Sequence, residues 1–433
     1  MQKNAKLFHG DISLWIIYFF FGIISLVEVY SATSQLTYRS THYYSPIIAH
    51  AVHLLLGAGV AWFVHWLPWK YFKRIGPVFL ILSLFGLALL TFTNLGTTGA
   101  GNSGARWFSI MGINFQPSEF AKMFLVMYVA LVLTIDHGEK GSRDEAYKEI
   151  LVMAVPTCAL IAAENISTAG ILWFVVLSMM IIGRVPWKQW GALLGGTVLF
   201  IVVGFGTLKA LPQESPIYDL PMLGRVQTAK MRLERKFSKI TPDNVQDYDF
   251  DQIRQRVHAN TAIANANFIG RMPGNSRERD SLSQAYSDFI FAIILEETGL
   301  WGGAIVILLY LMLLLRVGKI ASQCERCFPA FMIMGLVIMI CLQALINMLV
   351  AVDSFFITGQ PLPFISRGGT SLLVSGIEMG IFLSVSRYVR RLQREKESAS
   401  SALNPGLQVD EHSGGEDVAF EVAPVDNLEE YAE

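Results

Sequence analysis

The sequence predicts an all-α, polytopic membrane protein with about ten transmembrane helices and a large extracytoplasmic loop between helices 7 and 8. Hydrophobic residues make up 53% of the 433 residues and charged residues only 16%, and the mean hydropathy is +0.44. Apolar stretches of roughly the 20 residues needed to cross a bilayer recur along the chain. Basic residues gather in alternate connections between these stretches, as membrane topology requires.

Each apolar stretch predicts one helix. In chain order, the predicted spans are residues 14–31, 47–67, 76–95, 120–135, 150–163, 169–183, 191–211, 288–315, 329–352 and 371–386. The fifth and sixth are short and joined by a tight turn, so they can also be read as half-helices that meet near one surface. Together they define a transmembrane domain over residues 1–391.

The charged connections orient the helices. Lys and Arg collect on one side, whereas the short loops of the opposite side hold one each, namely Arg39, Arg106 and Arg367. Because basic loops stay in the cytoplasm, we expect both termini there and the loop of about residues 212–287 outside. That loop begins with basic residues that can bind anionic headgroups or simply face solvent. Residues 392–433 are acidic and predict a disordered cytoplasmic tail.

Charged side chains in apolar helices are costly and suggest function or internal ion pairs. Asp288 stands at the start of the eighth span, followed in the same stretch by Glu296 and Glu297. At 1.5 Å per residue, Glu296 lies about 12 Å deeper than Asp288, so we expect the two glutamates to satisfy neighbouring helices or a polar cavity.

Two further groups of residues belong to the same face. Pro117 and Ser118 can open a helix with Glu119 in its first turn, and Lys122 can pair with Glu119 on one helix face. Capping alone can also explain Ser118 and Glu119. Residues 358–371 contain two prolines and three glycines before the last span. Irregular backbone at membrane depth predicts a site, whose amides can face an anion.

Other chemistry finds little support. Cys324 and Cys327 have a metal or redox spacing, but one such pair is most simply two incidental cysteines. The chain contains no nucleotide-binding loop, zinc-protease motif or serine-nucleophile elbow. The first span has no convincing cleavage site, so it is expected to remain as a helix.

The chain closely resembles the SEDS family (shape, elongation, division and sporulation), the bacterial FtsW/RodA/SpoVE group, over about residues 14–391. The matching stretches are Val29-Tyr30-Ser31-Ala32, Gly104-Ala105-Arg106-Trp107, Phe115-Gln116-Pro117-Ser118-Glu119, Ser287-Asp288-Phe289-Ile290-Phe291-Ala292 with Glu296-Glu297 and Gly299, and Pro361-Leu362-Pro363-Phe364-Ile365-Ser366 with Gly368-Gly369. Within the family, the chain resembles division members more than elongation members.

The resemblance implies a peptidoglycan glycosyltransferase in the bacterial cytoplasmic (inner) membrane, at the division septum. Its expected partners are lipid II, a class B penicillin-binding protein and other divisome proteins, with no nucleic acid. In this chemistry a sugar hydroxyl attacks an anomeric carbon and expels a lipid pyrophosphate. Asp288 is the expected general base and the ligand of a divalent ion, Mg²⁺ or Mn²⁺. The expected substrate-binding residues are Arg106, Trp107, Glu119, Lys122, Ser366, Arg367, Gly368 and Gly369.

Four positions depart from the family pattern. Ser283-Gln284 replaces a Pro-Glu pair, Thr358 replaces a lysine found in some division members, and Arg367 replaces a tyrosine. A Gln-Pro-Asp-Leu-Gly-Thr-Ala stretch is only faintly echoed by Ala163–Ala169. We expect Arg367 to supply the charge of the missing lysine.

Two other functions stay open at this stage. A lipid II flippase would need polar residues through both leaflets, and Glu28 in the first span and Glu378 in the last are the residues that suggest one. A non-catalytic division scaffold would tolerate Asp288→Ala. The predicted gathering of charges at one membrane surface favours the enzyme.

Overall fold

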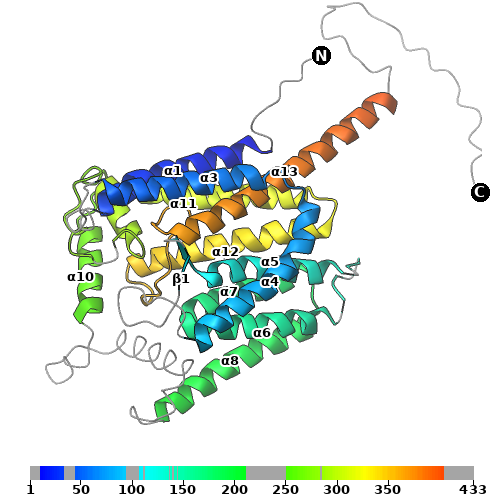
Figure 1. Ribbon diagram of the computed structural model, residues 1–433, viewed down its shortest axis with the longest axis horizontal. Coiled ribbons are helices and arrows are strands. Elements are labelled where there is room, and N and C mark those ends of the chain that lie inside the picture. Colours follow the sequence, from blue (N-terminus) through cyan, green and yellow to red (C-terminus); the bar gives the residue numbers. More distant parts are fainter. Residues whose placement is uncertain are drawn as a thin grey trace, which may run out of the picture. The chain divides into compact units, whose positions relative to one another are not determined.

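The computed structural model of the chain describes residues 10–33, 44–93, 107–110, 113–135, 137–138, 141–143, 145–210, 250–282 and 285–403 (Figure 1). Its helices are α1 (Ile12–Ala32), α3 (Ser45–Val64), α4 (Trp69–Phe92), α5 (Pro117–Thr134), α6 (Ala146–Glu164), α7 (Ile166–Ile182), α8 (Trp187–Ala210), α10 (Phe250–Ala264), α11 (Ile290–Ser322), α12 (Cys327–Ala351) and α13 (Gly369–Leu403). Strands β1 (Phe108–Ile110) and β2 (Ile113–Phe115) form an antiparallel hairpin.

The predicted all-α membrane fold is confirmed. Each predicted span corresponds to one helix, and eight of the described helices are long and apolar enough to cross a membrane. Helix α7 is apolar but has only 17 residues, so the total of ten spans stays a prediction. The hairpin was not predicted, because strands of three residues are too short to give an alternating pattern.

Three of the spans form the interior of the bundle. The buried share of the most apolar window is 78% in α13, 72% in α5 and 61% in α12, compared with 22% in α3 and in α4. Helices α4 and α7 both pack against α5, and α11 packs against α12. Apolar side chains such as Leu55 and Phe92 remain exposed on the outer helices. In a bilayer these side chains face lipid, whereas α5, α12 and α13 can carry polar groups away from it.

The tight turn between the fifth and sixth spans is a single residue. Asn165 ends α6 and begins α7, and its side-chain oxygen accepts a hydrogen bond of 3.0 Å from the amide of Ser167. Its extended backbone (φ −156°, ψ 107°) reverses the chain between the two helices. The side-chain cap satisfies one of the free amides at the start of α7, so this joint is well defined.

The chain divides into two compact units, Met1–Arg390 and Arg391–Glu433. The first holds every residue discussed as a site. In the second, the described part is the end of α13, where Arg391 and Glu395 form an exposed ion pair one turn apart. The cytoplasmic position and disorder of the tail stay predictions.

Candidate functional site

A cavity of about 240 Å³ lies among the helix ends of α5, α6, α7 and α13. Its walls carry polar and apolar groups together. The residues that line it are Trp107, Gln116, Ser118, Glu119, Ile161, Glu164, Asn165, Thr168, Tyr286, Ser287, Gly359, Gln360, Pro361, Arg367, Gly368 and Ser371. A concave space of this kind between membrane helices, with several ionisable groups, is the best candidate for a binding site.

Asp288 lies beside this cavity, not within the helix where the sequence analysis put it. Helix α11 begins at Ile290, and its cap residue is Phe289, so Asp288 sits in the turn before the helix. The predicted start of the span was therefore wrong by two residues, because apolarity continues through the turn. Asp288 is half-buried, and its Oδ1 accepts a hydrogen bond of 2.9 Å from the Ser287 hydroxyl.

Neighbouring elements hold the main chain of Asp288 in place. The side-chain amide of Asn347, on α12, donates to the carbonyl of Asp288 at 3.0 Å and to that of Gln360 at 2.8 Å. The amide of Gln360 in turn donates to the Thr168 hydroxyl of α7 at 2.5 Å. These bonds join α7, α12 and the segment before α13 around the carboxylate, so its position is defined by three parts of the bundle.

The segment before α13 is held by hydrogen bonds within itself and to the residues that precede Asp288. The Ser366 hydroxyl accepts from the amide of Leu362 at 2.8 Å and donates to the carbonyl of Ser287 at 2.7 Å. The amide of Ser366 donates to the carbonyl of Leu362, and that of Arg367 donates to the carbonyl of Tyr286. These two amides are therefore engaged within the protein, and the expectation that amides of this segment face an anion stays a prediction for the other residues.

Arg367 brings positive charge to the cavity. Its guanidinium lies over the ring of Tyr286, with the guanidinium carbon 5.4 Å from the ring centre. Burial lowers the pKa of Arg367 from its ordinary value, and Tyr286 acts against this shift. An arginine keeps its proton in proteins, so Arg367 remains a cation that can bind phosphate oxygens through several donors.

The predicted pair of Glu119 and Lys122 is confirmed. The Lys122 ammonium lies 2.7 Å from Glu119 Oε1, and Lys122 is 1% exposed. Both residues and Glu378 line a smaller space of about 10 Å³, which is enough for one water molecule. Glu119 lines both spaces, whereas Lys122 lies behind it. Helix α5 is capped by Gln116 without a side-chain bond, so capping does not explain Ser118.

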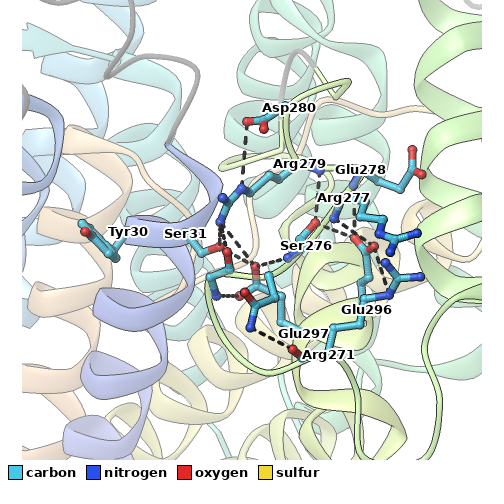
Figure 2. A network of polar contacts seen from close by, with 12 residues as sticks. Tyr30, Ser31, Arg271, Ser276, Arg277, Glu278, Arg279, Asp280, Glu296 and Glu297 are labelled. Carbon is cyan, nitrogen blue, oxygen red and sulfur yellow. Dashed lines mark hydrogen bonds and ion pairs between the residues drawn. The ribbon is translucent and has the colours of Figure 1, made fainter.

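Glu296 and Glu297 accept hydrogen bonds from the loop segment that precedes Asp288 (Figure 2). Glu296 accepts from the Ser276 hydroxyl at 2.5 Å and the Arg277 amide at 3.1 Å. Glu297 accepts from the amide of Gly274 at 2.9 Å and from the Ser31 hydroxyl of α1. Both carboxylates are fully buried. The expected contact with a neighbouring helix is confirmed for Glu297, through Ser31, whereas the other partners of the two glutamates lie in the loop before α11.

Main-chain contacts reinforce the same region. The amides of Arg271 and Met272 donate to the carbonyls of Glu296 and Glu297 at 3.0 and 2.7 Å. Helix α11 is interrupted at Gly299, where φ is +70°. A Cβ on Gly299 would lie 2.5 Å from the amide nitrogen of Gly270, so only glycine permits this approach.

The expected substrate-binding residues fall into four groups. Trp107, Glu119, Arg367 and Gly368 line the cavity. Lys122 and Ser366 are buried next to it. Gly369 lies close to the side chain of His53, since a Cβ on Gly369 would lie 3.0 Å from His53 Nε2. Arg106 lies outside the described residues, as do Ser283 and Gln284.

Sequence reasoning missed several lining residues, notably Glu164, Asn165 and Tyr286. The available signal was the charge of Glu164 at the tight turn between two apolar spans. Glu28, by contrast, is 2% exposed and lies near Glu297 inside the bundle, and does not line this cavity.

A divalent cation at Asp288 stays a prediction, which can be compared with the chemistry of the residues present. Among the described residues, no three His, Cys, Asp or Glu side chains come together as a complete protein-only metal site. Mg²⁺, however, usually binds to one or two carboxylates and completes its shell with water and substrate phosphates. Asp288 offers a half-buried carboxylate of this kind beside the cavity.

Comparison with known proteins identifies the family. Residues 11–391 match the FtsW/RodA/SpoVE family, described as "Cell cycle protein". Relatives named "Probable peptidoglycan glycosyltransferase FtsW" occur in Geobacter sp. (strain M18), with 29% identity over 86% of this chain and 94% of the relative, and in Nitrosococcus halophilus, with 30% identity over 78% and 81%.

Solved structures show the same fold. A chain from a peptidoglycan synthase complex superposes with a TM-score of 0.67 at 23% identity, over 88% of this chain and 98% of the other. The rod shape determining protein RodA of Thermus thermophilus superposes with a TM-score of 0.60 at 20% identity, over 87% and 97%. With a match that extends over nearly all of its transmembrane region, the chain belongs to the FtsW/RodA/SpoVE family of membrane proteins.

Proposed function

We propose that this protein is a peptidoglycan glycosyltransferase that polymerises lipid II, with Asp288 as general base. The observation that carries the proposal is the cavity between membrane helices, which combines Arg367 with carboxylates and lies beside Asp288. A substrate with a lipid chain, a pyrophosphate and sugars needs apolar, cationic and hydrogen-bonding surfaces together. The names of the relatives support the same activity.

The reaction joins two lipid-linked disaccharides. The 4-hydroxyl oxygen of the acceptor sugar forms a bond to the anomeric carbon of the donor, whose bond to the lipid pyrophosphate breaks. The hydroxyl proton passes to Asp288, and the bonding electrons leave with the pyrophosphate. A single displacement inverts the anomeric centre and needs only one base, since no glycosyl-enzyme intermediate forms.

The residues around Asp288 orient this base. The Ser287 hydroxyl donates a hydrogen bond to Oδ1 of Asp288, and in this proposal the same carboxylate accepts the sugar proton. Asn347 and Ser366 hold the main chain on either side of the carboxylate. Positioning of this kind contributes to rate because the reacting atoms must approach to about 3–3.5 Å in the correct alignment.

Arg367 stabilises the leaving group in this proposal. Its guanidinium can donate two parallel hydrogen bonds to pyrophosphate oxygens, as the negative charge develops there. Arg106 would add a second cation, and Trp107 an apolar wall for a sugar ring. A divalent ion held by Asp288 and the pyrophosphate would neutralise further charge. In this proposal Glu119 and Lys122 contribute to substrate binding through their ion pair at the cavity wall.

The proposed setting is the bacterial inner membrane at the division septum, with both termini in the cytoplasm and a class B penicillin-binding protein as partner. The names of the relatives support the division role, and the transmembrane helices support the membrane setting.

The test is polymerisation of purified lipid II by the protein in complex with its penicillin-binding partner. We expect glycan from the native chain and none from Asp288→Asn, which keeps the size of the side chain and removes the base. EDTA should abolish the product, and added Mg²⁺ or Mn²⁺ should restore it. Equal product from Asp288→Asn would refute the role of Asp288.

The same preparation distinguishes the alternatives. Absence of glycan from an intact native complex, together with movement of labelled lipid II across a liposome bilayer, would replace the polymerase by a flippase. Absence of both activities would favour a scaffold. As a matched control, Glu28→Gln changes a buried carboxylate outside the cavity and should leave polymerisation intact.

A further inference from the structure

Tyr286 belongs to the short stretch of main chain that carries the proposed base. Its carbonyl accepts a hydrogen bond of 2.9 Å from the amide of Arg367, and the next carbonyl accepts one of 2.7 Å from the Ser366 hydroxyl. The carbonyl of Asp288 accepts one of 3.0 Å from the side-chain amide of Asn347. Because three successive carbonyls are held in this way, the main chain from Tyr286 to Asp288 has a defined position in the protein.

The side chain of Tyr286 contacts the same arginine. The guanidinium carbon of Arg367 lies 5.4 Å from the centre of the Tyr286 ring, which is within the range of a cation–π interaction. Both residues line the 240 Å³ cavity. Among the residues that the structure describes, the guanidinium has no hydrogen-bond or ion-pair partner. Its N–H donors are therefore available to a ligand.

An aromatic ring is well suited to hold a cation that must also bind a ligand. An arginine side chain has several rotatable bonds, and restricting them before the ligand arrives reduces the entropic cost of binding. A carboxylate partner would accept the N–H donors and offset the charge, whereas a ring attracts the guanidinium through its face. The ring of Tyr286 can thus fix Arg367 and leave its donors to a ligand.

We propose that Tyr286 is a positioning residue that holds the Arg367 guanidinium at a fixed place relative to Asp288, where it receives the pyrophosphate of a prenyl-linked substrate. This inference rests on the proposed glycosyltransferase function. In a single displacement the attacking hydroxyl and the leaving pyrophosphate lie on opposite sides of the anomeric carbon, so the base and the cation must keep a set separation. Tyr286 links the two, because its ring contacts the cation and its main chain leads to the base.

The ring of Tyr286, and not its hydroxyl, is the group that this arrangement requires. We expect Tyr286→Leu to weaken the binding of farnesyl pyrophosphate about fivefold or more, because the cation–π contact is lost. Tyr286→Phe keeps the ring and should bind this probe within about twofold of the native chain. In an Arg367→Gln background, adding Tyr286→Leu should have no further effect, since Tyr286 acts through the guanidinium.

Isothermal titration calorimetry of the protein in complex with its penicillin-binding partner measures these affinities without any polymerisation. Farnesol, which has the prenyl chain but no phosphates, is the matched control and should not distinguish the variants. Steady-state polymerisation of lipid II by the same preparations should show kcat/KM falling in the same order. Thermal unfolding midpoints close to that of the native chain show that the variants are folded, and Tyr286→Met is a second ring-free variant if Tyr286→Leu unfolds.

The outcomes separate the inference from the function on which it rests. Native affinity in the ring-free variants, or no binding of farnesyl pyrophosphate by the native chain, would overturn the inference. An equal loss in Tyr286→Phe would do so too, because the hydroxyl would then be the group that matters. A loss from Tyr286→Leu that persists in Arg367→Gln would show that Tyr286 acts without the guanidinium, and would also overturn it. The expected pattern of affinities without glycan from the native complex would support the pairing of Tyr286 with Arg367 and refute the proposed polymerase.

Discussion

Replacing Lys122 by methionine will remove the cation from a buried group of charges. The Lys122 ammonium lies 2.7 Å from Glu119 Oε1, and the two side chains are 2% and 13% exposed. Glu378 lines the same small space and interacts electrostatically with Lys122. Loss of one member of a buried ion pair costs about 3–5 kcal/mol, because a carboxylate remains without its partner. We therefore expect the free energy of unfolding to fall by about 3 kcal/mol or more.

Because Lys122 lies near two carboxylates, Glu119 and Glu378, single substitutions in this group should lower the free energy of unfolding by different amounts. Glu119→Gln leaves Lys122 with Glu378 and should cost less than Lys122→Met. The double variant should be more stable than the sum of the single losses predicts, by at least about 1 kcal/mol, because the residues are in direct contact. Adding Glu378→Gln to the double variant should recover further stability, since it removes the last buried charge of the group.

Equilibrium unfolding in mixed detergent micelles, followed by tryptophan fluorescence, measures these differences. The exposed pair of Arg391 and Glu395 provides the control, with side chains 80% and 57% exposed. Arg391→Ala should change stability by no more than about 0.5 kcal/mol. A loss below about 1 kcal/mol for Lys122→Met, or strictly additive effects in the double variant, would refute the reasoning.

Three further predictions concern the supporting structure. Gly299→Ala should destabilise the protein by more than about 2 kcal/mol, because φ is +70° and the new Cβ would meet the Gly270 backbone. Gly195→Ala is the control, since a Cβ there has open space and should be neutral or stabilising in the same unfolding assay. Arg279→Ala removes hydrogen bonds to Ser31 and Gly274 and should speed proteolysis between residues 265 and 282, unlike the exposed Arg277→Ala. Burial raises the pKa of the Cys324 thiol to about 12, so the thiol stays protonated at pH 8 and should resist maleimide. Mass spectrometry of the native and the denatured protein after maleimide treatment measures the labelling of Cys324.

The helices and one ion pair were predictable because their causes are local. Bilayer thickness fixes the length of each apolar run, and the spacing of Glu119 and Lys122 puts both on one helix face. The start of α11 was misjudged because apolar residues continue through the turn at Asp288. Glu378 and Lys122 line the same small space and interact electrostatically, which depends on how α13 and α5 are placed in the bundle and is not encoded by spacing within one helix. Glu164 belongs to the same class, since its place in the cavity follows from the joint at Asn165.

The bonds from residues 271–277 to Glu296 and Glu297 tie the end of the large loop to α11. Because residues 271–277 are bonded to α11, these bonds oppose a movement of the preceding chain before that movement reaches Asp288. One residue added after Gly270 would shift the register of every contact that follows.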